Sequence, residues 1–519
     1  MKTSPGGTCQ TGTPPPAIGK TDLRFEARGS DPDDDAKLGR DLKHVRIKVW
    51  RADGHVVTDS TLTPDSTGLV WTDVPSASFT HGHRYYWSAW SIDQAGWWSA
   101  GGPAGTDAVC SFTVDHVAPP SPAVRSVHFP EPGPDGSEWS LHPAATPDQW
   151  IEVLGNGARA EDIAEFQWSL NRPTYDQKTW VWDAANALGS IKLKVDTAGP
   201  NVLYVRTRDK AENVSPATTY FFYVRPRPGQ DKPGDVTGDG MPDILAVDGA
   251  GNLRTYAGDA AGDTDAWMPA ALKDGKPVED GYWTDGPDKA ALITHSLDWM
   301  PGDGLTDLIA RMPDGKLYVY PGDGTGRFDV GRRRPMLLPP GAPDPAGFRQ
   351  IVAVEDVTGD RVPELFALAG DTLWALTGYR GASFGEARQV ATGWAERDLI
   401  GVRDVSGDKV PDLLFRDSPS GDLLLRKGKA GADGGVDLGS FKSAVASLGG
   451  ADTEYGDSGW SRAAVPRLHG TADATGDGIP DFWMVHDNGV QRLVPGGTTA
   501  HGWGGAGDED GWHLFKAIG

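Results

Sequence analysis

The sequence predicts an all-β protein in which two β-sandwiches precede a β-propeller, with five blades favoured for the propeller. Three observations lead to this fold class. Short runs of alternating or continuous apolar residues recur along the whole chain. The 69 glycines and 40 prolines among 519 residues suit a chain with many turns. Finally, an acidic loop followed by an apolar run recurs five times between residues 228 and 519.

The first two units are predicted at residues 1–117 and 118–227, each having about the 100 residues of a β-sandwich. Pro-rich segments at 118–122 and 225–233 mark their boundaries. Strands are indicated by alternation or aromatic density at 23–27, 45–49, 85–90 and 112–114, and then at 191–195, 202–205 and 221–224.

The two units share one short pattern. Asp93-x-Ala95-x-x-x-Ser99 and Asp209-x-Ala211-x-x-x-Ser215 each lie just before the closing strand of their unit. These segments resemble Ig-like or fibronectin-type-III-like sandwiches of the kind found in large secreted bacterial proteins. The resemblance implies a duplicated pair of such domains.

The repeats begin with acidic loops at 235–243, 298–307, 356–364, 404–412 and 473–481. Each loop continues into an apolar run, a Gly-containing turn and a second apolar run that ends in Gly, which predicts a strand, a tight turn and a strand. Successive loops are spaced by about 50 to 70 residues, a period suited to one four-stranded blade. Five blades would fill residues 228–519.

Each loop gathers three carboxylates within about ten residues, which is unfavourable unless a cation neutralises them. A hard cation with oxygen ligands, of the calcium type, suits such a loop best. An EF-hand requires Glu at position twelve, where this chain has Ala246, Ala367, Phe415 or Met484. The alternative is a set of hydrated Asp-Gly turns without metal.

The loops resemble the FG-GAP or VCBS-type repeats of integrin-like β-propellers, which bind calcium between two strands. The resemblance implies up to five Ca²⁺ sites, with these side chains as the ligand set: Asp235, Thr237, Asp239 and Asp243; Asp298, Asp303 and Asp307; Asp356, Thr358, Asp360 and Glu364; Asp404, Ser406, Asp408 and Asp412; Asp473, Thr475, Asp477 and Asp481. Position three departs from the family's Asp or Asn, and Arg361 and Lys409 place a cation at position six. Asp298 lies one residue too early, so the first and fifth loops match best and the second least.

The end of the chain matches an earlier segment in frame. Residues 511–519 and 393–401 both begin Gly-Trp and end Ile-Gly. The last strand therefore either completes the first blade, which removes exposed sheet edges, or forms the outer strand of the fifth. The sequence leaves both possibilities open.

The only cysteines, Cys9 and Cys110, flank the strands of the first unit and suit a disulfide, with two free thiols as the alternative. A disulfide would indicate an oxidising compartment, and hence a secreted or extracellular protein. Residues 1–8 lack the apolar segment of a signal peptide, so we expect a trimmed chain or a segment of a longer secreted protein. The sequence contains no run of about 18 apolar residues, so it does not predict membrane insertion.

The net charge of −23 argues against a nucleic-acid partner. Ser383 and Ser458 lie in segments similar to serine-hydrolase motifs, but Ser383 aligns with a loop of the preceding repeat and Ser458 lacks the accompanying His segment. His81 and His83 are interpreted as surface residues. We therefore expect no catalytic residues.

Two further features allow alternative interpretations. The tryptophans of the repeats are interpreted as core between blades, the alternative being platforms for sugar rings; they are Trp283, Trp374, Trp394, Trp460, Trp483 and Trp512. The acidic segment 31–35 is interpreted as a solvated turn, the alternative being one more calcium site.

Together these features predict a non-catalytic, extracellular, calcium-stabilised binding or adhesion module for a glycan or protein partner. One alternative is a structural spacer, or presentation segment, of a larger secreted adhesin or toxin. A polysaccharide-active enzyme is the third hypothesis.

Overall fold

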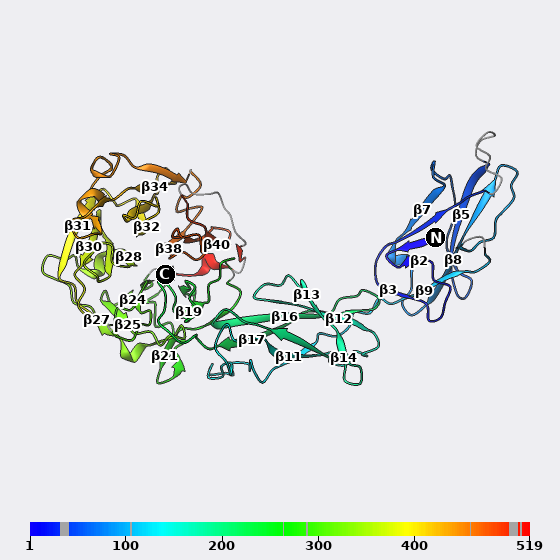
Figure 1. Ribbon diagram of the computed structural model, residues 1–519, viewed down its shortest axis with the longest axis horizontal. Helices are drawn as coiled ribbons and strands as arrows, with labels where there is room; N and C mark the ends of the chain where they lie inside the picture. The colour runs from blue at the N-terminus through cyan, green and yellow to red at the C-terminus, as the bar shows by residue number, and fades with distance from the viewer. Residues whose placement is uncertain are drawn as a thin grey trace.

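The computed structural model describes residues 1–31, 41–103, 106–262, 264–286, 289–300, 302–456, 458–497, 507–508 and 511–519. In these residues the protein is all-β, since the helical segments are short 3-10 turns. The turns are η1 (Ser76–Ser78), η3 (Val330–Arg332), η4 (Pro345–Gly347), η5 (Leu438–Phe441), η6 (Ala444–Ala446) and η7 (Trp512–Leu514). Figure 1 shows two sandwich-like units and a larger group of sheets in chain order along the long axis.

The first unit packs two sheets around one core, and their strands are antiparallel except for one pair. One sheet has the order β2 (Gly7–Thr8), β1 (Lys2–Ser4), β4 (Leu23–Arg28), β7 (Leu69–Val74). The other has the order β3 (Ala17–Ile18), β9 (Cys110–Val114), β8 (Arg84–Asp93), β5 (Leu42–Arg51), β6 (Val56–Leu62), with β3 parallel to β9. The alternating residues Phe25 and Ile47 are fully buried because successive side chains of a strand point to opposite faces.

The second unit is also built from two sheets with a shared core. The first sheet has the order β10 (Ala123–Arg125), β11 (Gln149–Leu154), β15 (Leu188–Leu193), β14 (Val181–Asp183). The second has the order β13 (Gln177–Thr179), β12 (Ile163–Leu170), β16 (Gly199–Asp209), β17 (Thr218–Val224). Ile151 on one sheet and Phe166 and Phe222 on the other meet in the core.

The described part of residues 228–519 contains five four-stranded antiparallel sheets. Their orders are β20 (Trp267–Pro269), β19 (Leu253–Tyr256), β18 (Ile244–Val247), β42 (Ala517–Ile518); β23 (Leu292–His295), β24 (Leu308–Arg311), β25 (Leu317–Tyr320), β27 (Arg334–Pro335); and β28 (Phe348–Val354), β29 (Glu364–Ala369), β30 (Thr372–Thr377), β31 (Glu386–Thr392). The last two are β32 (Arg397–Arg403), β33 (Asp412–Asp417), β34 (Asp422–Arg426), β37 (Thr453–Gly456); and β38 (Arg467–Gly470), β39 (Phe482–Val485), β40 (Gln491–Val494), β41 (Gly507–Asp508).

Two small sheets accompany them. One has the order β22 (Lys276–Pro277), β21 (Ala271–Lys273), β26 (Phe328–Asp329), and the other joins β35 (Lys429–Ala430) to β36 (Val436–Asp437).

The last strand of the chain belongs to the first of the five sheets. Ala517 pairs with Val247, and Ile518 pairs with Ala246. Backbone hydrogen bonds of 2.9 and 2.8 Å between Leu245 and Gly519 extend this pairing. Of the two positions that the sequence allowed, the strand therefore takes the one beside β18.

Five hydrophobic cores lie between consecutive sheets. Leu245 packs with residues of the second sheet, and the next three cores join the second sheet to the third, the third to the fourth and the fourth to the fifth. In the last core, Trp483 and Val485 of the fifth sheet pack with Ala246 of the first. The strands β42, β23, β28, β32 and β38 also contact one another in this cyclic order. All four residues of β18 are buried because a different core covers each face.

The tryptophans of the repeats lie mainly in these cores. Four of the six are at most 1% exposed, namely Trp283, Trp394, Trp483 and Trp512. Trp460 is 2% exposed, and Trp374 is half-buried. Burial of five of the six favours the core interpretation over sugar platforms. In the first unit, by contrast, Trp97 is 77% exposed and Trp98 is 51% exposed.

The units contact one another through polar groups. Between the first and second units, the amide of Asn213 donates to the carbonyl of Asp115 at 2.9 Å. Between the second unit and the repeats, Arg327 lies over the rings of Trp139 and Tyr223, at 4.9 and 5.4 Å from the ring centroids.

Candidate metal-binding loops

The acidic loops occupy equivalent places in the five sheets. Four of them connect β23 to β24, β28 to β29, β32 to β33 and β38 to β39, and loop 235–243 leads into β18. Each loop therefore precedes the second strand of its sheet, when the strands are counted from the one at the edge that is β42, β23, β28, β32 or β38. The structure thus presents five similar oxygen-rich loops at one kind of strand connection.

Most of the loops share one hydrogen-bonding pattern, in which the carboxylates accept from the loop's own backbone. In the fifth loop, Asp473 accepts from the N–H groups of Gly476 and Gly478, both at 2.7 Å. Asp481 accepts from the N–H of Thr475 at 2.8 Å and from that of Gly496 at 2.6 Å. The last carboxylate thereby fixes both the start of the loop and the end of the second apolar strand.

The third and fourth loops repeat the bonds to the first Asp. Asp356 accepts from the N–H of Arg361, and Asp404 from that of Lys409, at 2.7 and 2.8 Å. Both donors have positive φ, +71° and +69°, at the position where the other loops have glycine. L-residues with side chains adopt this conformation at a cost, so these two loops carry local strain.

The first loop is the most deeply buried. Asp235, Asp239 and Asp243 are each at most 2% exposed, and Thr237 is fully buried. Asp243 Oδ2 accepts from the N–H groups of Val236 and Thr237 at 2.7 and 2.9 Å. Such burial of three carboxylates favours a cation beside them.

The pKa values of these carboxyls express the same unfavourable burial. Burial, followed by the nearby charge of Asp235, raises the pKa of Asp239 to about 7. Burial and the charges of Asp239 and Asp235 also raise the pKa of Asp243 well above its usual value. The donor set of the first loop therefore fits a hard divalent cation.

The second loop contains a buried oxygen without a partner. Among the described residues, Asp298 Oδ1 is buried and accepts no hydrogen bond, while Oδ2 accepts from the N–H of Gly304 at 2.8 Å. Asp303 accepts from Leu305, and Asp307 accepts from Trp299 at 2.8 Å. The early position of Asp298 thus still leaves an oxygen that a cation can use.

Sequence reasoning missed one acidic residue beside this loop. Asp231 accepts from the N–H of Thr306 at 2.8 Å. Burial, together with the charges of Asp235, Asp303 and Asp298, raises the pKa of Asp231 to about 7. Asp231 lies in the Pro-rich segment before the first repeat, and nothing in that segment's spacing marks it as part of an acidic loop.

The third loop brings its carboxylates closest together. One oxygen from each of Asp356, Asp360 and Glu364 lies within 4.8 Å of the others. The first and fifth loops, which match the repeat pattern best, do not form such a group among the described residues. Glu364 is one methylene longer than the Asp at this position elsewhere, which extends the reach of its carboxylate. The loops that match the repeat pattern best are therefore not the ones whose carboxylates lie closest together.

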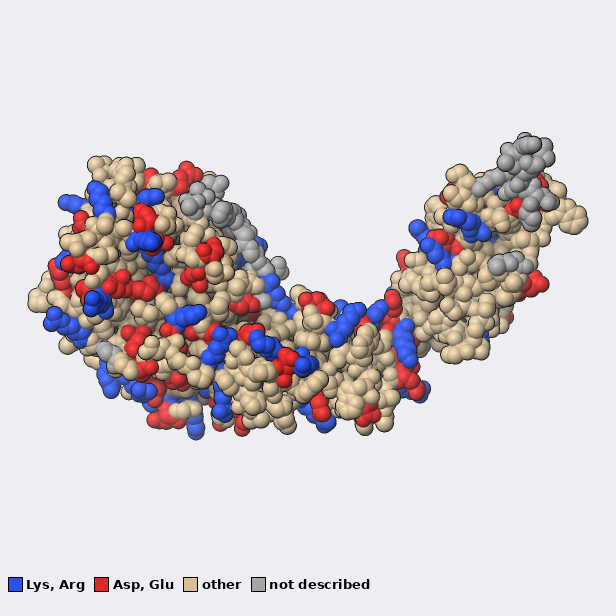
Figure 2. Space-filling model, viewed as in Figure 1, with Lys and Arg blue, Asp and Glu red and all other residues tan. Residues whose placement is uncertain are grey.

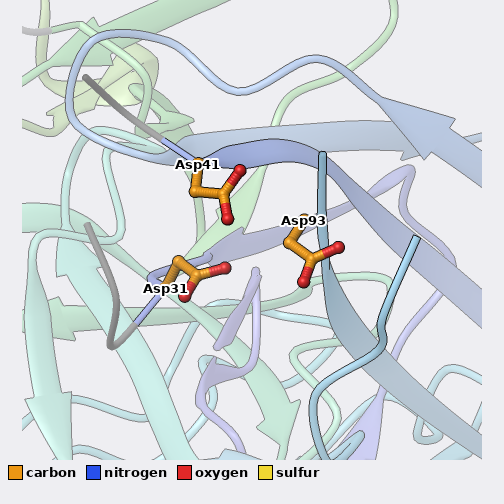
Figure 3. A group of neighbouring side chains, drawn as sticks. All are labelled: Asp31, Asp41 and Asp93. Atoms are coloured by element: carbon orange, nitrogen blue, oxygen red, sulfur yellow. The ribbon is translucent and has the colours of Figure 1, made fainter. Parts of the chain in front are cut away.

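A second acidic group lies in the first unit. Asp31 follows β4, Asp41 precedes β5 and Asp93 ends β8, and Figure 3 shows their carboxylates facing a common space. Asp93 Oδ1 also accepts from the N–H of Trp97 at 2.8 Å. The rest of the acidic segment considered from the sequence, residues 32–35, lies outside the described residues.

Ser383, from a segment similar to a serine-hydrolase motif, and His81 contact nearby structural groups. Ser383 lies between β30 and β31, and its hydroxyl donates to the carbonyl of Arg380 at 3.0 Å. His81 lies 3.3 Å from the carboxylate of Asp115 and is half exposed.

Cys9 and Cys110 are joined in a disulfide, which confirms the pairing expected from their positions. Among the described residues, no helix has the length and apolar character needed to cross a membrane.

No protein-family model matches the sequence. No curated protein matches it either. Comparison with solved structures finds similarity to the fibronectin(III)-like modules of Clostridium thermocellum CbhA, with 11% identity over 42% of this chain and 93% of that chain, and a TM-score of 0.27. An Agrocybe aegerita lectin has 15% identity over 53% of this chain and 75% of its own, with a TM-score of 0.29. Part of a 1.5-MDa bacterial ice-binding adhesin has 11% identity over 57% of this chain and 91% of that chain, with a TM-score of 0.19.

Proposed function

We propose that this chain is a non-catalytic, extracellular binding module. In it, two Ig-like sandwiches present a calcium-stabilised, five-bladed propeller of the FG-GAP type to a glycan or protein partner. The observation that carries the proposal is the repetition of one oxygen-rich loop at the same strand connection of five four-stranded sheets. Repetition of one loop in one structural context favours a common ligand.

The closed propeller is supported by the way in which the first and fifth sheets meet. Trp483 of β39 and Ala246 of β18 share a core, as neighbouring blades do. β42, from the end of the chain, provides the first strand of the first sheet. A ring closed in this way joins the two ends of the repeat region and leaves fewer exposed sheet edges.

Calcium is supported by the chemistry of the loops. Carboxylate, hydroxyl and carbonyl oxygens are the ligands that calcium prefers in proteins. When bound, the ion supplies positive charge that offsets the mutual repulsion of the acidic side chains. Asp235, Asp239 and Asp243, with Thr237, would hold it in the first loop, and the equivalent residues would do so in the others. In four of the loops the last Asp meanwhile holds the loop's start beside the end of the second strand, by accepting hydrogen bonds from both.

The first loop also bears on the junction with the second sandwich. Asp239 Oδ2 accepts a hydrogen bond from the N–H of Ala198 at 2.8 Å. Arg227, just before the first repeat, donates to the carbonyl of Asp196 at 2.8 Å. Order in this loop therefore promotes a fixed connection between propeller and sandwich, which suits a protein that presents a binding surface.

An extracellular location is supported by the disulfide between Cys9 and Cys110, since such bonds persist in oxidising compartments. The structural spacer remains the second candidate, favoured by the succession of units along the long axis in Figure 1. Deletion of the propeller from the secreted protein distinguishes the two, because loss of partner binding supports a binding module and unchanged binding supports a spacer.

A calcium titration followed by thermal unfolding tests the metal assignment. Ligands that bind the native state alone stabilise it, so we expect millimolar calcium to raise the Tm and a chelator to lower it. The double variant Asp235→Asn/Asp239→Asn should show a smaller calcium-dependent shift, and Asp280→Asn, outside the loops, should behave as the unmodified protein. An unchanged Tm across the titration would remove calcium from the proposal. A glycan and protein array probed in millimolar calcium then tests binding.

A further inference from the structure

A cavity of about 480 Å³ lies where the first strands of the sheets begin, away from the acidic loops that follow those strands. Its lining includes residues at the start of four sheets: Leu292 of β23, Arg349 of β28, Asp398 of β32 and Arg467 of β38. Lys516, just before β42, completes the circle. The cavity and the acidic loops therefore lie at opposite ends of the same strands.

The cavity is strongly basic although the chain as a whole is acidic. Among the residues that the structure describes, its lining has five basic side chains and one carboxylate. The basic side chains are Arg349, Arg416, Arg462, Arg467 and Lys516, and the carboxylate is that of Asp398. Basic and acidic side chains are intermingled over the face of the repeats shown in Figure 2. The lining residue His469 adds no charge at neutral pH, because burial lowers its pKa to about 3.

One carboxylate serves three of the arginines. Asp398 Oδ1 pairs with Arg349 at 3.1 Å and with Arg462 at 2.7 Å, and Oδ2 pairs with Arg416 at 2.6 Å. Arg462 has a second partner in Glu396 at 3.2 Å, whose side chain is 66% exposed. Among the described residues, these three arginines thus share two carboxylates, Asp398 and Glu396.

Arg467 has no carboxylate partner among the described residues. Its terminal nitrogens donate only to the carbonyls of Pro466 and Phe515, at 3.3 and 3.2 Å. Its Nε and that of Arg349 are buried and donate no hydrogen bond within the described part of the chain. Burial lowers the pKa of Arg467, which reflects the cost of keeping this cation away from water.

The volume and the lining of the cavity indicate the size and chemistry of a ligand. Its volume falls within the range of small-molecule sites and exceeds that of a simple inorganic ion. Leu292, Ile351 and Ile518 give the lining an apolar part, and Gln350 adds a polar amide. Guanidinium groups bind carboxylate and sulfate oxygens through paired hydrogen bonds.

We propose that this cavity binds a small organic oxyanion, the carboxylate or sulfate group of an acidic sugar or a related organic acid, with Arg467 as its main cationic contact. The site goes beyond the proposed function, because it lies at the other end of the strands and needs no metal in the acidic loops.

Calorimetric titration of the full chain with sodium glucuronate and with sodium sulfate tests this site, with glucose as the neutral control and sodium chloride used to hold ionic strength constant. We expect binding of at least one of the two anions and none of glucose. Binding of glucuronate alone identifies a carboxylate site, and binding of both identifies a general oxyanion site. The proposal would be overturned if neither glucuronate nor sulfate bound.

Variants locate the site. A hydrogen bond to a charged group contributes enough free energy that Arg467→Gln should weaken anion binding by about tenfold. Arg462→Gln, at a side chain that is 38% exposed, provides a second test if the first variant does not fold. Arg334→Gln, on exposed β27, is the matched control and should bind normally. Equal affinity in all three variants would place the anion elsewhere and refute the site.

The titration is repeated with calcium and with chelator. Anion binding that survives chelation supports the cavity independently of the acidic loops. Conversely, a calcium-dependent Tm without anion binding refutes this site and leaves the proposed function intact.

Discussion

Arg327 donates a hydrogen bond from its guanidinium to the carbonyl of Gly136 at 2.8 Å, and so joins the repeat region to the second sandwich. The same side chain is 8% exposed and lies over the rings of Trp139 and Tyr223. This contact links residues 191 positions apart in the sequence. It makes the junction between the two units a specific interface.

Arg327→Ala should weaken this junction. Loss of the hydrogen bond and of the cation–π contacts should destabilise the chain by about 1 to 3 kcal/mol. Urea unfolding followed by tryptophan fluorescence measures the change, because Trp139 lies at the contact. Arg334→Ala, at an exposed position, is the control. Identical unfolding curves for Arg327→Ala and the unmodified protein would show that the contact adds no stability.

Lys409→Gly should stabilise the fourth loop. Lys409 has φ of +69°, which glycine adopts without the steric cost that a side chain incurs. The expected gain is up to about 1 kcal/mol, and removal of a cation should also strengthen calcium binding. The reciprocal change, Gly478→Ala in the fifth loop at φ of +89°, should destabilise the protein. Thermal unfolding with and without calcium measures both, and a lower Tm for Lys409→Gly would contradict the strain argument.

The ion pairs of Asp398 predict an acid-sensitive contribution to stability. Burial raises the pKa of Asp398, but the hydrogen bond from Arg462 and the charge of Arg416 outweigh it and lower the pKa to about 2. The folded pKa lies below the unfolded value of about 3.9, so this contribution is complete above that value and is lost as the pH falls towards 2. Its size is about 2 kcal/mol.

Asp398→Asn tests this linkage. The stability difference between the unmodified protein and the variant, measured by urea unfolding, should be large at pH 6 and should shrink below pH 4. Subtracting the two curves removes the titration of every other group that the variant leaves unchanged. A difference that stays constant down to pH 2.5 would refute the assigned ion pairs.

Reduction of the disulfide should unfold the first sandwich more easily than the rest. Cys9 and Cys110 close a loop with a sequence separation of 101, for which chain entropy gives about 4 to 5 kcal/mol of stabilisation. Cys9→Ala/Cys110→Ala should therefore lower the first sandwich's unfolding temperature in calorimetry. The transition of the repeat region serves as the internal control. An unshifted first transition would show that the bond contributes nothing.

The sequence predicted much of the local structure because turns and strands depend on nearby residues. The run at 244–247 is a strand with every residue buried, as its continuous apolar character indicates. The acidic loops likewise share their hydrogen bonds because Gly and Asp recur at fixed spacing in them. The closed propeller and the bound calcium stay predictions.

The candidate site was less predictable where distant segments meet. Asp231 reaches the second loop from a Pro-rich segment, and Thr306, its hydrogen-bond donor, is 75 residues away. The third loop, with Glu364 in place of Asp, gathers its carboxylates more closely than the loops that match the pattern better. Such proximity depends on side-chain reach and burial, which spacing alone does not encode.

The sequence by itself determined the all-β character, the acidic loops and the positions of the cysteines, because these follow from composition and short-range pattern. Only the tertiary structure decided that β42 joins β18, and that Arg349, Arg416 and Arg467 share one cavity with Asp398. Those relationships depend on which strands pack side by side. Packing of separate sheets is fixed by the summed burial of many side chains, and no single segment specifies it.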